Sequence, residues 1–277
     1  MGMRISTNVS AINAQRTMTT SQRAIGKSME QLSSGSRINK AADDAAGLAI
    51  SESLKSQVRS LSQASRNAND GISMVQTAEG GLSEVSNILV RMRELGVQAS
   101  SDTIGDTERG FLNKEVQQLK EEAQRITQTT KFGTTKLLDG SANKFDFQVG
   151  IGNDPEADRI SFNAGETNAS IDKLGISNFD FSSKGGAQKA LSAIDNAQTT
   201  VNGYRANLGA LQNRLSSTVD NLGVQHENIS AANSRIRDTD IAAASAESTR
   251  NSVLLQANTS VLAQANAMPN AALRLIG

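Results

Sequence analysis

The feature that most constrains this chain is a column of apolar residues that recurs every seven positions in its C-terminal half. The column consists of Ile194, Val201, Leu208, Leu215, Leu222, Ile229 and Ile236. A seven-residue spacing places such side chains along one side of an α-helix that packs against another helix. The sequence therefore predicts one long helix over about residues 187–238.

The first half of the chain carries a matching column. It consists of Leu54, Leu61, Ala68, Val75, Leu82 and Leu89. We expect a long helix that begins after Asp44, as its N-cap, and a third helix that doubles back after the loop Ser101–Gly110. Residues 44–129 and 187–238 would then form one helical bundle, with the two columns as its seam.

The hydrophobic period changes between the two helical halves. The stretches "KFDFQVGIG" and "RISFN" alternate apolar and polar residues, as half-buried strands do. Residues 130–186 are predicted to form a small β-rich segment that contains a hairpin and cannot fold without the bundle. The predicted fold class is mainly α, a long helical bundle or coiled coil built from both halves of the chain.

Both ends of the chain have amphipathic helical patterns. The N-terminal stripes contain Ile5, Val9, Ile12, Met18 and Ile25, and the C-terminal stripe contains Leu254, Leu255, Val261, Leu262 and Met268 before the pattern stops at Pro269. Neither helix buries enough apolar surface to be stable alone. We predict that residues 3–34 and 241–277 pair with each other and that other molecules cover what the pair leaves exposed.

The composition excludes several classes of function. The chain has no cysteine, so disulfides and thiolate metal sites are excluded, and its formal net charge of zero disfavours binding to nucleic acid. No apolar run approaches the roughly 20 residues of a membrane-spanning helix. The single histidine, His226, has no partner residues for catalysis or metal binding, and we interpret it as structural. We expect no enzymatic activity and no cofactor.

Several long motifs resemble those of bacterial flagellins. They are "MRISTNVSAINAQRTM", "LSSGSRINKAADDAAGLAISESL", "NANDGISMVQTAEGGLSEV", "NRLSSTVDNL", "ENISAANSRIRDTDIA" and "QANTSVLAQANAMPNAALRLIG", in this order along the chain. The resemblance covers roughly 130 N-terminal and 90 C-terminal residues. It implies a short form of the family, because residues 130–186 leave room for only a reduced outer domain.

The resemblance implies a secreted subunit that polymerises with its own copies into the extracellular flagellar filament. Family partners would be the flagellar type III export apparatus, a flagellin chaperone, the filament cap and hook-associated proteins. The family organisation makes the terminal segments an inner-tube domain and residues 35–43 a connecting spoke. It also implies recognition by Toll-like receptor 5 through Arg91, Leu95 and Glu115, although Val90 stands where the family commonly has Gln.

Two other functions compete with a filament subunit. A hook-filament junction protein has similar termini, but the flagellin-type motifs within the bundle favour the filament. A membrane-active amphipathic-helix protein would carry a Lys/Arg stripe on its polar face, whereas the terminal helices here are rich in Ala, Asn, Gln and Ser.

Overall fold

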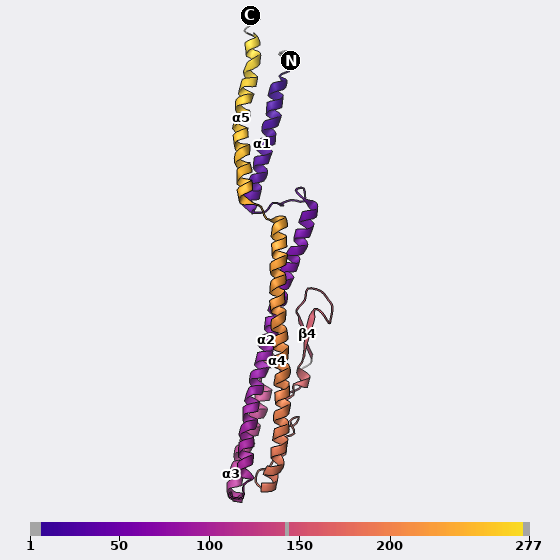
Figure 1. The fold of residues 1–277 in the computed structure, drawn as a ribbon, viewed down its shortest axis with the longest axis vertical. Helices are drawn as coiled ribbons and strands as arrows, with labels where there is room; N and C mark the ends of the chain where they lie inside the picture. Colours follow the sequence, from indigo (N-terminus) through magenta and orange to yellow (C-terminus); the bar gives the residue numbers. More distant parts are fainter. Residues whose placement is uncertain (1–6, 142–143, 274–277) are drawn as a thin grey trace. The chain divides into compact units, whose positions relative to one another are not determined.

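The computed structural model describes residues 7–141 and 144–273, except for the side chains of 269–273. Within these residues the fold is mainly helical, which confirms the predicted fold class (Figure 1). The helices are α1 (Val9–Ser34), α2 (Ala45–Ala99), α3 (Asp106–Thr129), α4 (Lys184–Arg237) and α5 (Ile241–Leu273). The strands are β1 (Lys131–Phe132), β2 (Thr135–Lys136), β3 (Lys144–Gln148) and β4 (Arg159–Asn163), and η1 (Ala164–Glu166) is a short 3-10 helix.

The chain divides into two compact units. One comprises residues 1–58 and 228–277, and the other comprises residues 59–227. The first unit holds α1 and α5 together with the adjoining ends of α2 and α4. The second holds the rest of α2 and α4, helix α3 and the β-rich segment.

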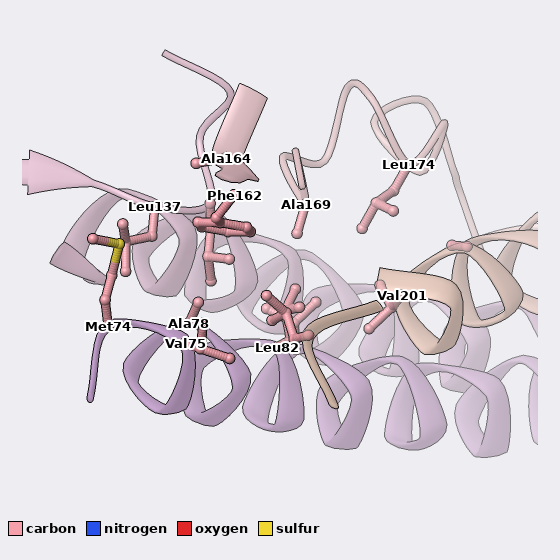
Figure 2. Close-up of a cluster of buried hydrophobic side chains, with 14 of the residues drawn as sticks. Met74, Val75, Ala78, Leu82, Leu137, Phe162, Ala164, Ala169, Leu174 and Val201 are labelled. Carbon is pink, nitrogen blue, oxygen red and sulfur yellow. The ribbon is translucent and has the colours of Figure 1, made fainter. Parts of the chain in front are cut away.

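The core of the second unit is shared between the helices and the β-rich segment. Figure 2 shows side chains from both parts pointing toward one another: Met74, Val75, Ala78 and Leu82 of α2, Val201 of α4, and Leu137, Phe162, Ala164, Ala169 and Leu174 of the β-rich segment. All of these are buried. An isolated two-stranded sheet is only marginally stable in water. The helices therefore supply the apolar surface on which the strands fold.

Two glycines of α2 let the β-rich segment approach the helix closely. A Cβ atom on Gly71 would lie 3.2 Å from the ring of Phe147, and one on Gly81 would lie 2.6 Å from the Oγ1 atom of Thr130. Strands β3 and β4 pair antiparallel, with Phe145 opposite Phe162 and their rings stacked. The absence of side chains at these two positions of α2 therefore makes room for the β-rich segment.

The turn between α2 and α3 is closed by one buried arginine. Arg109 donates from Nε to the carbonyl of Ala99 at 2.9 Å and from Nη2 to the carbonyl of Ser101 at 2.8 Å. Its Nη1 atom pairs with Asp106 at 2.7 Å. Because the last carbonyls of a helix lack partners within the helix, this side chain satisfies the end of α2.

The helix ends agree with the sequence at one place and differ at another. Asp44 accepts a hydrogen bond from the backbone N–H of Gly47 at 2.8 Å, as the predicted N-cap of α2. The apolar pattern stops at Pro269, yet α5 continues to Leu273. A proline removes one backbone donor and its ring crowds the carbonyl four residues earlier, so a helix that continues past it loses that hydrogen bond and tends to kink.

Candidate assembly surface

The two terminal helices, α1 and α5, lie side by side in antiparallel orientation; we call them the terminal helix pair (Figure 1). The positions that face the partner helix recur every seven residues and carry small or amide side chains. They are Ala14, Ser21 and Ser28 of α1, and Ala244, Asn251, Asn258 and Ala265 of α5. We call this set the small-residue seam. All but the partly buried Asn258 are buried.

Two polar contacts cross the small-residue seam. The Nδ2 atom of Asn8 donates to the carbonyl of Ala265 at 2.7 Å, and the Nδ2 atom of Asn258 donates to the Oγ atom of Ser21 at 3.4 Å. Polar side chains at such positions fix the register of a helix pair while adding little stability. Together they define which residues of α1 and α5 lie opposite each other.

The large apolar side chains of the terminal helix pair remain substantially exposed. On α5, Leu254, Val261 and Met268 recur every seven residues with exposed fractions of 46%, 53% and 52%; we call them the exposed column. On α1, Val9 and Ile12 are exposed as well. Of the other predicted stripe residues, Met18, Ile25, Leu255 and Leu262 are partly buried, and Ile5 lies outside the described residues.

The sequence analysis predicts a contact between the two terminal segments but does not identify the side chains that fill it. The buried positions of the seam carry alanine, serine and asparagine, whereas the stripe residues Met18, Ile25, Leu255 and Leu262 are covered only in part. The signal that could have revealed it was the seven-residue spacing of Ser21 and Ser28, and of Asn251 and Asn258. Because the buried positions carry small or amide side chains and the large apolar ones are covered only in part, the pair gains less hydrophobic stabilisation from its contact than a seam of fully buried apolar side chains would give.

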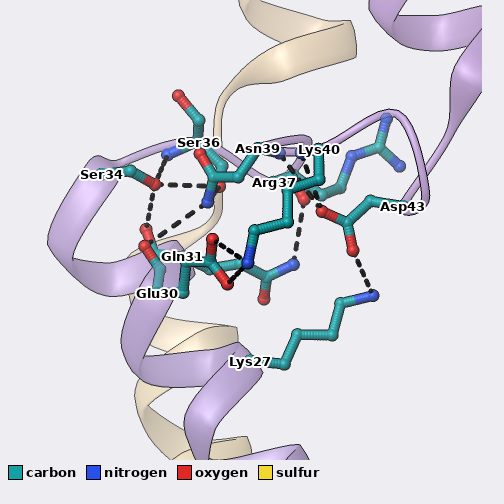
Figure 3. Close-up of polar contacts among 9 residues, drawn as sticks. All are labelled: Lys27, Glu30, Gln31, Ser34, Ser36, Arg37, Asn39, Lys40 and Asp43. Carbon is teal, nitrogen blue, oxygen red and sulfur yellow. Dashed lines mark hydrogen bonds and ion pairs between the residues drawn. The ribbon is translucent and has the colours of Figure 1, made fainter.

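The segment that connects α1 to α2 is held by polar contacts (Figure 3). Lys27 of α1 pairs with Asp43 at 3.1 Å, and Glu30 pairs with Lys40 at 2.7 Å. The hydrogen bond from Lys27 keeps the pKa of Asp43 below its usual range, and the one to Glu30 raises the pKa of Lys40. Ile38, only 1% exposed, anchors the segment.

The second connection, between α4 and α5, lies against the first. The N–H of Arg37 donates to the carbonyl of Arg237 at 2.6 Å, and the N–H of Thr239 donates to the carbonyl of Gly35 at 3.0 Å. Between these bonds, Ser36 and Asp238 form an antiparallel bridge. The connection between α1 and α2 and the connection between α4 and α5 are thus joined by backbone hydrogen bonds.

The predicted bundle seam residues differ in burial along the helices. The buried ones are Leu61, Val75, Leu82, Leu89, Ile194, Val201, Leu208, Leu215 and Leu222. Leu54, Ile229 and Ile236 are only partly buried. These three belong to the first unit, together with the terminal helix pair. In both columns, the side chains that belong to the first unit are therefore less buried than those of the second unit.

The three residues of the receptor pattern lie in different environments. Arg91 of α2 and Glu115 of α3 are exposed and form an ion pair at 2.8 Å, and Arg91 also pairs with Glu94 at 3.0 Å. The hydrogen bond that Arg91 donates to Glu115 raises the pKa of Arg91. Leu95 is only 1% exposed and packs in the core with Met92. Its side chain is therefore not available on the surface of the isolated chain.

A metal site or a membrane-spanning helix would indicate another kind of function. In 7–141 and 144–273, no group of three or more His, Cys, Asp or Glu residues is placed to hold a metal ion. In the same part of the chain, no helix is long and apolar enough to cross a membrane. His226 is partly buried on α4. Exposed apolar side chains of α1 and α5 include Val9, Ile12, Leu254, Val261 and Met268.

The fold and this surface define a class of helical protein in which helices from the two ends of the chain pair and leave part of their apolar side chains exposed. The model of the bacterial flagellin N-terminal helical region matches residues 5–143, and that of the bacterial flagellin C-terminal helical region matches residues 191–276. The chain belongs to the bacterial flagellin family.

Relatives of known name support this assignment over the whole chain. A flagellin of Halalkalibacterium halodurans is 47% identical over 274 residues, which cover 99% of this chain and 100% of that protein. A flagellin of Bacillus subtilis is 40% identical over 308 residues, with 99% and 100% covered. The complete match to a relative within 274 aligned residues agrees with a short form of the family.

Solved structures show the same fold. The crystal structure of Bacillus cereus flagellin aligns with a TM-score of 0.51 and 29% identity, covering 61% of this chain and 94% of that one. A putative flagellar hook-associated protein from Vibrio parahaemolyticus aligns with a TM-score of 0.58, covering 71% of this chain and 100% of that one. At 15% identity, the second likeness shows a common fold only.

Proposed function

We infer that this chain is a structural subunit that self-assembles into the bacterial flagellar filament, the propeller of swimming motility. The observation that carries the inference is the terminal helix pair, which has small side chains in its seam and the exposed column outside. Apolar side chains arranged in a continuous column favour burial against another protein surface. In a homopolymer, the surface that covers them is supplied by further copies of the same chain.

Seeded growth tests this function directly. Purified subunits are added to short filament seeds, and the polymer is measured by sedimentation and electron microscopy. A filament subunit elongates the seeds, whereas a hook-filament junction protein does not. Flotation with liposomes distinguishes the membrane-active alternative, since a filament subunit stays with the unbound fraction. Failure to elongate any seeds, with the helical fold intact, would contradict the inference.

The organisation into an inner-tube domain (3–34 with 241–277), a spoke (35–43), a bundle (44–129 with 187–238) and an outer segment (130–186) is part of the same proposal. Its support is the difference in burial between the exposed column on α5 and the buried seam residues of the bundle. Limited proteolysis of the monomer should remove about residues 1–40 and 240–277 first and leave the bundle. Equal resistance of both parts would contradict this organisation.

Secretion follows from the same physical argument. We propose that the chain leaves the cell through the flagellar type III apparatus with the help of a flagellin chaperone, and adds to the filament beneath the cap beyond the hook-associated proteins. A helix pair that gains little from its own contact remains easy to unfold before assembly. Secretion assays in strains lacking export or chaperone components would test these partners.

Recognition by Toll-like receptor 5 is a separate proposal. Its support is the exposed ion pair between Arg91 and Glu115, which joins α2 to α3 on the surface. We expect Arg91→Ala to weaken receptor activation, and we expect Leu95→Ala to act only by disturbing the core. A receptor reporter assay on monomers of equal helicity separates the two effects. The absence of enzymatic activity remains a prediction of the sequence.

A further inference from the structure

The methionines of this chain differ sharply in exposure. Met29 of α1 is 57% exposed and Met268 of α5 is 52% exposed. In the second unit, Met74 is 6% exposed and Met92 is fully buried. Met18 is partly buried, and Met1 and Met3 lie outside the described residues. Among the described methionines, the two most exposed are therefore those of the terminal helix pair.

Exposure controls the oxidation of methionine because the oxidant must reach the sulfur atom. With hydrogen peroxide, the thioether sulfur attacks one peroxide oxygen and the O–O bond breaks. The sulfur becomes a sulfoxide, and the second oxygen leaves as hydroxide and gains a proton to become water. Methionine loses two electrons and peroxide gains two. The product is polar where the original side chain was apolar.

We propose that Met29 and Met268 are oxidation sites at which peroxide-type oxidants prevent the free subunit from assembling. This proposal rests on the proposed function, since it assigns regulation by oxidation to the terminal helix pair that would carry out assembly. Met268 is a member of the exposed column, in line with Leu254 and Val261. A sulfoxide at this position places a strong hydrogen-bond acceptor on a surface that assembly would remove from water.

Burying such an oxygen without a donor carries a free-energy cost large enough to weaken a contact about tenfold or more. The core methionines provide the contrast within one molecule. Met74 and Met92 are sheltered from the oxidant and should react slowly as long as the second unit stays folded. Among the described methionines, oxidation should therefore concentrate on the terminal helix pair, and enzymatic reduction of the sulfoxide reverses it.

The test compares three full-length proteins: wild type, Met29→Leu/Met268→Leu, and the matched control Met74→Leu/Met92→Leu. Leucine has a similar volume and cannot form a sulfoxide. Each protein is treated with hydrogen peroxide, quenched with free methionine and mapped by mass spectrometry. Elongation of untreated seeds is then measured by sedimentation, before and after repair with methionine sulfoxide reductases A and B. Circular dichroism checks that each variant is folded.

We expect oxidation to reduce elongation about tenfold or more for wild type and for the control variant, and the reductases to restore it. The Met29→Leu/Met268→Leu variant should elongate equally well before and after treatment. Equal losses in this variant and wild type would overturn the proposal, and so would full elongation by wild type with both sites converted. Failure of untreated wild type to elongate seeds would refute the proposed function itself. The untreated sample therefore separates failure of the proposed function from failure of the oxidation proposal.

Discussion

Replacing the exposed column with alanine tests the role of the terminal helix pair most directly. Leu254, Val261 and Met268 are each about half exposed in the isolated chain. Complete burial of such a side chain is worth about 1.5–3 kcal/mol, so covering the exposed half contributes about 0.7–1.5 kcal/mol. The three together would contribute about 2–4 kcal/mol to the addition of one subunit.

This magnitude predicts a measurable change in the critical concentration for assembly. A single alanine substitution in the column should raise it about 3- to 10-fold, and the triple variant about 30- to 1000-fold. The critical concentration is read from the unpolymerised protein that remains in equilibrium with seeds after sedimentation. The helicity of the monomer should stay close to that of wild type, because the substituted positions are outside the small-residue seam.

A matched control is available on the same helix. Thr259 is exposed, and its Oγ1 atom donates to the carbonyl of Gln256 in its own helix at 2.7 Å. Thr259→Ala should therefore leave assembly nearly unchanged, since it removes no apolar contact. A triple variant that polymerises within about twofold of the wild-type critical concentration would refute the burial argument.

Three further predictions concern the remaining contacts. Arg109→Leu should lower the free energy of unfolding of the second unit by about 2–4 kcal/mol in urea titrations, because two carbonyls lose their partner; an unchanged midpoint would contradict this. The lowered pKa of Asp43 means that its contribution is present above its usual value of about 3.9 and is lost as the pH falls through the folded value. An NMR titration of the Lys40 amide, which donates to Asp43, should therefore show a midpoint that rises in Lys27→Met, and an identical midpoint would count against the ion pair. Asn258→Leu should overpack the seam, destabilise the terminal helix pair by about 1–3 kcal/mol and reduce seeded growth. Asn258→Ala should have a smaller effect, and equal growth of the two variants would argue against a narrow seam.

The helical architecture and the family could both be predicted from local sequence patterns. The heptad columns ending in Leu89 and Ile236 specify long helices, because a seven-residue apolar repeat fits only a helix that packs on another helix. The change to alternating residues near Phe145 and Phe147 located the hairpin, because successive side chains of a strand point to opposite faces. Such patterns are local, so they can be recognised without the rest of the chain.

Only the tertiary structure could show which side of each terminal helix faces its partner. The apolar stripe around Leu254 and Leu255 predicted a contact but not its geometry, since a broad stripe can face a partner at several rotations. The packed pair places Ser21 and Asn258 in the seam and leaves Leu254 and Val261 half exposed. That rotation depends on how closely two backbones approach, which is a property of both helices together.

The same physical reason explains the contacts that join distant parts of the sequence. The sequence around Gly71 does not predict its contact with the ring of Phe147. The sequence around Arg109 likewise does not predict that its guanidinium donates to the last carbonyls of α2. These contacts join residues that only folding brings together, as the buried position of Leu95 also illustrates. The sequence thus specified which segments are helices and strands, and the packing of those segments determined which side chains are left for other molecules.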